Sequence, residues 1–393
     1  MMNKKVAFLI NSLDTGGAQK ILLTLYDEFI AQDLMNDIIC LENKIDYKLN
    51  KSTNVILLSN KKPVRTGIFK FLSIPYFAFR LLLLVRKEKI DIIVSHLYRS
   101  NYINVLAQIF GSKHKSIIVN HMYVSFEKNK GLLGKTNLFL IRYLYAKANA
   151  LVLISKKMLL DIKKHLKNHG NEIVIYNPHN KAEIEKKTLK PITEFKFKKS
   201  KYYLISVGRL IARKRVEDII EAMSKLTNTY SNLELIILGD GPEKLKLEKL
   251  SDSLNLSTKI HFMGNVANPY KFISHSDIFI LSSESEGLPN VIIEAMYCKT
   301  AVISTDCPTG PSEILNPKNN NLVKKNTSFL LGEYGILYPI ADIDLLVESI
   351  KFMIDNKTIK SELEKKAYKR ANDFNKEKIA NDYIELIDNL SNK

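Results

Sequence analysis

Two carboxylates in the second half of the chain have a spacing and a setting suited to holding a ligand. Glu286 and Glu294 stand eight residues apart in Ser-Ser-Glu-Ser-Glu-Gly-Leu-Pro-Asn-Val-Ile-Ile-Glu-Ala-Met, residues 282–296. Pro289 is typical of the first turn of a helix, where its missing N–H costs no hydrogen bond. We therefore expect Glu286 in the loop before a helix and Glu294 one to two turns inside it. An apolar strand predicted over 277–281 leads in, and open α/β sheets bind ligands, phosphate among them, where such a strand meets a helix N-terminus.

Two cations follow another predicted strand. Residues 202–207 are apolar, and Gly208-Arg209-Leu210-Ile211-Ala212-Arg213-Lys214 comes next, before a helix that begins near residue 216. Arg209 offers a planar fork of donors and Lys214 a compact point charge. In a strand-to-helix turn, this pair can grip a diphosphate from two sides.

Apolar runs alternate with helical stretches along the whole chain, and they must position these side chains. The pattern is that of doubly wound parallel sheets, and 393 residues favour two domains. We place the first domain at 1–185, a polar, Lys-rich linker at 186–201, the second domain at 202–372 and a last helix at 373–393. The predicted strands cover 6–10, 37–41, 55–58, 90–95, 116–120, 150–154, 172–176, 202–207, 233–238, 259–262, 277–281 and 301–304.

The complete string around Glu286 and Glu294 resembles the retaining glycosyltransferases of family 4. The resemblance is strong over 202–340, weaker over 1–180, and implies the GT-B fold, in which two Rossmann-like domains face each other across a cleft. It also implies a nucleoside diphosphate sugar as co-substrate. Glu286 would contact the sugar ring and Glu294 would accept hydrogen bonds from the ribose. Three residues between them, Gly287, Leu288 and Pro289, belong to the same motif.

Other parts of the resemblance supply further site residues. Arg209 and Lys214 match the family's diphosphate-binding pair, which stabilises the departing diphosphate without a metal. Gly264 and Val266 match a stretch beside the nucleotide base, and the last helix would cross back onto the first domain. The expected chemistry is a front-face transfer in which the leaving phosphate takes the acceptor proton, so neither Glu acts as the nucleophile of a retaining hydrolase.

The first half contributes a glycine turn and a histidine. Gly16 and Gly17 follow the first predicted strand and let the backbone approach the donor diphosphate at a helix N-terminus. They resemble the family's GGAE loop, although Gln19 stands where the Glu is common. His121 follows the strand over 116–120 and matches a histidine that lies near the donor sugar in the family, so we expect it in the catalytic site. His96, at another strand end, is a weaker candidate of the same kind.

The net charge of +18 is concentrated in the first half. Residues 1–190 hold 31 Lys and Arg against 14 Asp and Glu, whereas residues 191–393 hold 28 against 27. A basic field attracts nucleic acid, anionic lipid or a phosphorylated substrate. Basic residues also interrupt the apolar segment 65–89, and 128–147 repeats the mixture. No uncharged run reaches the ~20 residues of a spanning helix, so 65–89 is either an interfacial amphipathic segment or a helix buried under a basic outer face. We favour the interfacial interpretation, with acceptor or membrane contacts at Arg65, Lys70, Arg80, Arg86 and Lys87.

We therefore expect a retaining, metal-independent transferase of surface glycan or glycoprotein oligosaccharide assembly. Its donor would be a UDP-linked N-acetylhexosamine and its acceptor a polyprenyl-diphosphate-linked saccharide. The protein would be cytoplasmic, peripheral on the anionic inner face of the plasma membrane. Two alternatives are a GT-B nucleotide-sugar 2-epimerase and a non-catalytic membrane-binding relative. No cofactor is expected. Nucleic acid is not expected as a partner, because apart from positive charge the sequence has no feature of a nucleic-acid-binding protein.

Overall fold

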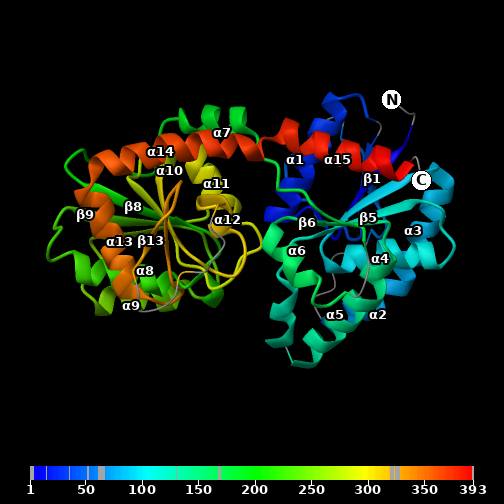
Figure 1. Cartoon of the computed structure of the whole chain (residues 1–393), viewed down its shortest axis with the longest axis horizontal. Helices are drawn as coiled ribbons and strands as arrows, with labels where there is room; N and C mark the ends of the chain where they lie inside the picture. Colours follow the sequence, from blue (N-terminus) through cyan, green and yellow to red (C-terminus); the bar gives the residue numbers. More distant parts are fainter. Residues whose placement is uncertain are drawn as a thin grey trace. The chain divides into compact units, whose positions relative to one another are not determined.

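Each half of the chain builds its own parallel sheet (Figure 1). The computed structural model describes residues 4–14, 16–34, 36–50, 53–60, 67–129, 131–166, 170–318, 323 and 328–391. The first unit comprises Met1–His179 with Lys376–Lys393, and the second comprises Asn180–Asn375. Both are Rossmann-like α/β units.

The first sheet has the strand order β3-β2-β1-β4-β5-β6-β7, and every described pairing in it is parallel. All the residues of β1, β4 and β6 are buried, as expected for apolar strands covered by helices on both faces. The order reverses between β1 and β4, which is where doubly wound sheets open a ligand crevice. Its strands are β1 (Val6–Ile10), β2 (Asn36–Cys40), β3 (Val55–Leu57), β4 (Ile92–His96), β5 (Lys115–Asn120), β6 (Ala150–Leu153) and β7 (Glu172–Val174).

The second sheet repeats this topology in the order β10-β9-β8-β11-β12-β14-β13. Its described pairings are parallel apart from β13 with β14, which are antiparallel. The reversal lies between β8 and β11. The strands are β8 (Tyr202–Val207), β9 (Leu233–Leu238), β10 (Ile260–Gly264), β11 (Ile278–Leu281), β12 (Ala301–Thr305), β13 (Leu330–Leu331) and β14 (Ile336–Tyr338).

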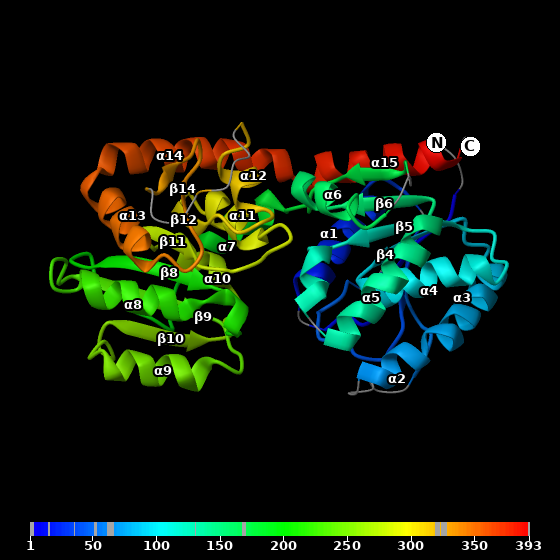
Figure 2. The ribbon, with the colours of Figure 1, turned by 60° about the horizontal axis from the view of Figure 1, so that its bottom comes forward.

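Helices cover the sheet of each unit. In the first unit α3 and α5 both pack on α4, as Figure 2 also shows. That unit holds α1 (Gly17–Ala31), α2 (Gly67–Leu72), α3 (Ile74–Glu88), α4 (Tyr98–Ile109), η1 (Val124–Asn129), α5 (Gly131–Leu144), η2 (Tyr145–Lys147), α6 (Lys156–Ile162) and α15 (Lys376–Ser391). The second holds α7 (Lys181–Thr188), η3 (Ala212–Lys214), α8 (Val216–Leu226), α9 (Lys244–Ser253), α10 (Pro269–Ile273), α11 (Asn290–Tyr297), α12 (Pro311–Leu315), α13 (Ile343–Asp355), α14 (Lys357–Ala371) and η4 (Asn372–Phe374).

The residues that we expected to form a linker are packed on the second unit. Phe197 lies edge-on to Tyr203, with ring centroids 4.7 Å apart, and Phe195 lies 4.9 Å from the ring of His261. The buried Lys271 ammonium donates to both carboxylate oxygens of Glu194, at 2.8 and 2.7 Å. The boundary between the units therefore falls at His179, before α7, and not in 186–201.

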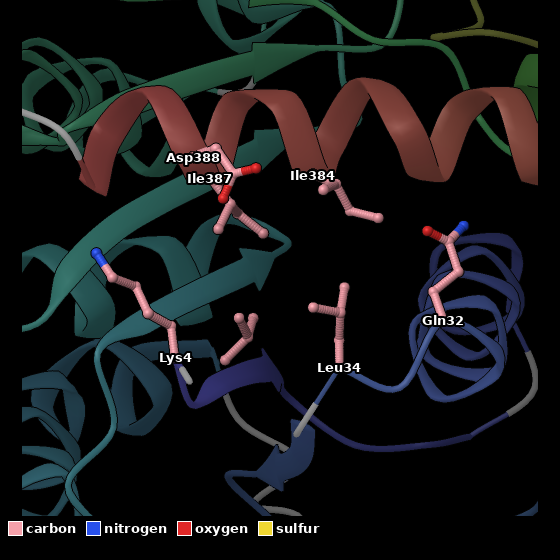
Figure 3. A pocket seen from close by; sticks show the side chains of 7 residues that line it. Lys4, Gln32, Leu34, Ile384, Ile387 and Asp388 are labelled. Carbon is pink, nitrogen blue, oxygen red and sulfur yellow. The ribbon is translucent and has the colours of Figure 1, made fainter. Parts of the chain in front are cut away.

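Helix α15 packs along α1 in the first unit (Figure 1). Its first residue, Lys376, donates its backbone N–H to the carbonyl of His179 at 3.0 Å and pairs through its ammonium with the buried Glu28. Figure 3 shows the groove that remains, with Ile384 and Ile387 facing Leu34. These contacts fix the C-terminal segment to the first unit from Lys376 onwards.

Candidate functional site

The two loops at the reversal point of the second sheet bring Lys214 and Glu286 together. Lys214 follows β8 and Glu286 follows β11, and these strands are neighbours. The Lys214 ammonium donates to Oε1 of Glu286 at 2.6 Å, with the side chains only 18% and 11% exposed. An ammonium has three N–H donors, so Lys214 can keep this bond and still meet a phosphate oxygen. Glu286 thus orients the cation that the sequence assigned to the diphosphate.

Hydrogen bonds to backbone carbonyls hold these two loops in place. Ser282 donates through its hydroxyl to the carbonyl of Lys214 at 2.8 Å, and the N–H of Glu284 donates to the carbonyl of Arg213 at 2.9 Å. The hydroxyl of Thr309 donates to the carbonyl of Glu286. The geometry of the pair is therefore set by the protein before any ligand arrives.

Arg209 lies in the same loop, and its side chain is exposed. It forms no ion pair or side-chain hydrogen bond with any other residue in the part of the chain that the structure describes. Its guanidinium therefore keeps its planar fork free for a bidentate contact with a phosphate. Arg209 and Lys214 differ in this respect, one cation being free and the other held.

Glycines stack at the carboxyl ends of three adjacent strands. Gly239 has φ of 139°, and a Cβ on it would lie 1.9 Å from the carbonyl oxygen of Gly208. The N–H of Gly239 donates to the carbonyl of Gly264 at 2.8 Å. Gly264, predicted beside the base, thus ends β10 next to the turn that follows β9. Val266 is half-buried two residues further on.

The loop before α11 packs tightly on a neighbouring turn. A Cβ on Gly310, which has φ of 95°, would lie 2.4 Å from Cδ of Pro289 and 2.9 Å from the carbonyl oxygen of Gly287. Leu288 is buried. Helix α11 begins at Asn290, so Pro289 immediately precedes the helix. Our prediction that Pro289 lies in the first turn is therefore wrong by one residue.

Glu294 lies one turn inside α11 and is buried, with 6% of its surface exposed. The hydroxyl of the buried Tyr270 donates to its Oε1 at 3.2 Å. A buried carboxylate needs hydrogen-bond donors, and ribose hydroxyls are of that kind. The Cys307 thiol lies near Glu286, and burial raises its pKa well above the ordinary value.

In the first unit, the glycine turn starts α1. Gly16 precedes the helix in an extended conformation and Gly17 is its first residue. The amide of Gln19 donates to Oδ1 of Asp14 at 2.6 Å, and a Cβ on Gly16 would lie 2.4 Å from Oε1 of Gln19. Gln19 thus folds over the turn and ties it to Asp14.

His121, which directly follows β5, lies beside His96, the last residue of the adjacent strand β4. Nε2 of His121 is 2.8 Å from Nδ1 of His96, and the ring centroids are 5.1 Å apart. His96 is fully buried and His121 half-buried. Burial lowers the pKa of His121 to about 4, and burial together with His121 lowers the pKa of His96 well below its usual value. Both rings are therefore neutral near pH 7.

Helix α3 has one buried face and one exposed face. Its inner residues, among them Phe77 and Leu81, are buried, as the interpretation of a helix packed against the fold requires. On the outer face Tyr76, Phe79 and Leu83 are 55%, 53% and 46% exposed. Arg80 donates to the Tyr76 hydroxyl at 3.1 Å. The other predicted cations in this region are the exposed Arg86 and Lys87 and the half-buried Lys70, while Arg65 lies outside the described residues.

Helix α5 carries a similar stripe. Leu132, Phe139 and Tyr143 are exposed at helical spacing, and the rings of Phe139 and Tyr143 stack with centroids 6.5 Å apart. The ammonium of Lys147 lies 5.2 Å from the centroid of the Tyr143 ring. We use the name aromatic-basic surface for the exposed apolar residues of these two helices and the cations next to them: Tyr76, Phe79, Leu83, Arg80, Arg86 and Lys87 on α3, and Leu132, Phe139 and Tyr143 on α5 with the adjacent Lys147.

Several site residues escaped the sequence analysis. Ser282 is the first residue of the motif 282–296, and a small hydroxyl residue in such a loop is the signal that could have pointed to it. Thr309 lies outside that motif, 23 residues after Glu286. Tyr270 has no such signal, because it lies 24 residues from Glu294 on a different helix. Among the described residues no group of three His, Cys, Asp or Glu is arranged to hold a metal ion. None of the described helices combines the length and the hydropathy that crossing a membrane requires.

The sequence matches two protein families over complementary parts. Residues 15–183 match Glycosyltransferase Family 4, and residues 190–371 match Glycosyl transferases group 1. The chain is 30% identical over 388 residues to the N-acetylgalactosamine-N,N'-diacetylbacillosaminyl-diphospho-undecaprenol 4-alpha-N-acetylgalactosaminyltransferase of Campylobacter jejuni. That alignment covers 98% of this chain and 99% of the relative. A second enzyme of that organism, GalNAc-alpha-(1->4)-GalNAc-alpha-(1->3)-diNAcBac-PP-undecaprenol alpha-1,4-N-acetyl-D-galactosaminyltransferase, is 25% identical, with 99% of both chains covered.

Solved structures share the fold at low identity. Sucrose-phosphate synthase from Thermosynechococcus elongatus aligns with a TM-score of 0.79 at 17% identity, covering 98% of this chain and 99% of that one. Anabaena HepE in complex with UDP aligns with a TM-score of 0.75 at 16% identity, covering 98% and 100%. The two family matches and the full-length similarity to a transferase show that the chain belongs to the family 4 glycosyltransferases, which have the GT-B fold.

Proposed function

We propose that this glycosyltransferase moves an N-acetylhexosamine from a UDP-sugar to a polyprenyl-diphosphate-linked saccharide, with retention at the anomeric carbon and without a metal. The observation that carries the donor half is the Lys214–Glu286 pair at the reversal point of the second sheet, in the loop that also carries Arg209, whose guanidinium has no side-chain partner among the described residues. The acceptor half is supported by full-length similarity to transferases named for diphospho-undecaprenol glycans.

The geometry gives each donor-site residue a physical role. Arg209 and Lys214 would neutralise the charge that grows on the departing diphosphate, which is the largest electrostatic demand of the reaction. Glu286 holds Lys214 in place at 2.6 Å and would meet the sugar ring on its other side. Glu294 would accept ribose hydroxyls while Tyr270 occupies its Oε1. The leaving phosphate would take the acceptor proton.

The experiment is release of UDP from a panel of UDP-sugars, each with and without a polyprenyl-diphosphate-linked sugar. We expect release that requires both one donor and the lipid, an α-linked product by NMR, and no loss after EDTA. Release or sugar isomerisation without the lipid would replace the proposal with hydrolysis or 2-epimerisation. Release from no UDP-sugar under any condition would contradict it.

We further propose that the aromatic-basic surface docks on the anionic inner face of the plasma membrane. Exposed Tyr76, Phe79 and Leu83 recur at helical spacing on α3, next to Arg80, Arg86 and Lys87. Apolar side chains can enter the headgroup region, while each cation near an anionic surface contributes about 1 kcal/mol. A substrate anchored by a lipid would then meet the enzyme at the membrane.

This docking is tested by sedimentation with vesicles that contain anionic lipid. Replacing Arg80, Arg86 and Lys87 together by Ser should reduce the bound fraction by more than tenfold at low salt, since three contacts of about 1 kcal/mol are lost. The matched control replaces three exposed lysines of α14 in the second unit, Lys357, Lys365 and Lys369. Equal loss in both variants would mean that net charge, and not this surface, drives the binding.

A further inference from the structure

The His96–His121 pair must share one proton, and the structure limits which ring supplies it. The two nitrogens that face each other are Nδ1 of His96 and Nε2 of His121, 2.8 Å apart. One of them must carry a hydrogen and the other a lone pair, because two protonated or two bare nitrogens would repel. In a pair of neutral imidazoles the bond made by one nitrogen sets the protonation of the other.

The far nitrogen of each ring decides between the two arrangements. Nε2 of His96 is buried and has no hydrogen-bond partner in the described part of the chain. If His121 were the donor, His96 would carry its own proton on that nitrogen, as a buried N–H without an acceptor. Such orphaned N–H groups are rare and cost about 1–3 kcal/mol, while an under-satisfied acceptor is tolerated more often.

We infer that His96 is a positioning residue, which donates its Nδ1 proton to Nε2 of His121 and so fixes His121 as the tautomer protonated on Nδ1. Nδ1 of His121 has no partner among the described residues and, unlike Nε2 of His96, is not one of their fully buried atoms, so this N–H is accessible to a ligand. The lowered pKa values of both rings agree with a neutral pair. His121 thus presents a donor, and at Nδ1 it has no lone pair with which to act as a base.

Backbone strain beside His96 supports a held geometry. Leu97, the next residue, has φ of 74° and ψ of 150°, a conformation that is unfavourable for a residue with a Cβ. A strained backbone conformation persists only where the surrounding structure holds it in place, and such residues are concentrated at functional sites. Phe8 lies on another side of the His96 ring, with centroids 6.5 Å apart. The ring is therefore confined by the fold.

The ligand that suits this donor is an oxygen acceptor, such as a sugar hydroxyl or a phosphate oxygen. This assignment of the ligand rests on the proposed function, whereas the tautomer does not. A fixed Nδ1–H donor would favour a donor sugar with an oxygen at that position and would need no proton transfer during the reaction. His121 would then act by orientation, and its contribution would depend on His96.

The tautomer is measured directly by long-range 1H–15N NMR of the full chain with 15N-labelled histidine. Among the signals of the eight histidines, those of His121 and His96 are assigned by their loss in His121→Gln and in His96→Leu. At pH 7 we expect both rings of the pair to be protonated on Nδ1. In His96→Leu, His121 should shift towards the Nε2–H form, whereas His96→Asn keeps an N–H near the same place and should preserve Nδ1–H. A wild-type His121 protonated on Nε2, or an unchanged tautomer in His96→Leu, would overturn the inference.

Kinetics then separate a positioning role from a structural one. We expect kcat/KM to fall about tenfold in His96→Leu, the effect of losing one ordinary hydrogen bond, and to stay within about threefold in His96→Asn. Both variants must keep the wild-type unfolding midpoint for this comparison. Equal losses in both would assign His96 a packing role. The NMR measurement needs no substrate, so it decides the tautomer even if the proposed transfer reaction fails.

Discussion

Breaking the Lys214–Glu286 pair is the sharpest test of the donor-site geometry. The change is a double-mutant cycle with Lys214→Met, Glu286→Gln and the combined variant. Lys214→Met leaves a carboxylate that is only 11% exposed without its cation, and Glu286→Gln leaves an ammonium that is 18% exposed without its anion. The combined variant replaces both charges by neutral groups of similar shape. It should therefore lose less stability than the two single variants together.

The expected coupling follows from the distance and the burial. At 2.6 Å and an effective dielectric constant of 20, the gross Coulomb attraction is about 6 kcal/mol. Desolvation of two partly buried ions offsets most of it, leaving a coupling of about 1–3 kcal/mol, between the values of exposed and fully buried pairs. Lys214→Met should destabilise the protein more than Glu286→Gln. The Lys214 ammonium that remains in Glu286→Gln has a long side chain and can reach water, whereas the Glu286 carboxylate that remains in Lys214→Met has a shorter one.

The assay is urea unfolding followed by circular dichroism, since the chain has no Trp. The two units can unfold separately, so the cycle is read from the transition that all three variants shift. UDP release is measured in parallel, and all three variants should lose it, because the combined variant restores stability without restoring the cation. A coupling energy below about 0.5 kcal/mol would refute the held pair, since that is the additivity error of independent sites. Full UDP release by Lys214→Met would refute its diphosphate role.

Three further outcomes follow from single positions. Gly239→Ala should abolish donor binding and lower the unfolding midpoint, because its Cβ would lie 1.9 Å from the carbonyl oxygen of Gly208; normal UDP binding by calorimetry would contradict the tight stacking of these turns. Glu294→Gln should keep the fold and weaken UDP-sugar binding about tenfold or more through loss of a charged hydrogen-bond acceptor, with unchanged binding counting against the ribose assignment. His114 is buried, which lowers its pKa from 6.5 to about 4. The unfolded chain therefore binds the His114 proton first as the pH falls, and His114 alone should lower stability by about 1.4 kcal/mol per pH unit between pH 6.5 and 4, in addition to the decline caused by the lowered pKa values of His96 and His121. His114→Asn should flatten that slope in urea titrations, and an unchanged slope would contradict it.

Strand positions were predictable where the strands are parallel and buried, as at the centre of both sheets. The runs at 6–10, 202–207 and 233–238 match β1, β8 and β9 residue for residue, since strands covered on both faces need continuous apolar side chains. Strand β13, two residues long and antiparallel to β14, has too little sequence to carry a pattern. The linker was placed too late because Lys-rich composition hid Phe195 and Phe197, which pack on the second unit.

Site residues were predictable where they lie in loops that follow neighbouring strands of the sheet. Glu286 and Lys214 lie on separate loops, yet the topology alone implies their meeting, because β8 and β11 are neighbours at the reversal point. Side-chain partners from distant elements were not predictable. Tyr270 reaches Glu294 from another helix, and His96 meets His121 only because β4 and β5 pair in one register. A single sequence carries no signal for such contacts.

The net charge indicates function only when the positions of the charged residues in the structure are known. The second half is nearly neutral, with 28 basic and 27 acidic residues, yet it places an exposed Arg209 and an oriented Lys214 at one edge of its sheet. The first half holds the excess, and on α3 part of it borders exposed aromatic rings. A diphosphate needs two cations at fixed positions, whereas a lipid surface needs many at loose ones. The cations of the two units should therefore differ in their sensitivity to substitution. In the second unit the loss of one cation should abolish binding of the donor diphosphate. In the first unit several cations must be replaced before docking on the membrane weakens.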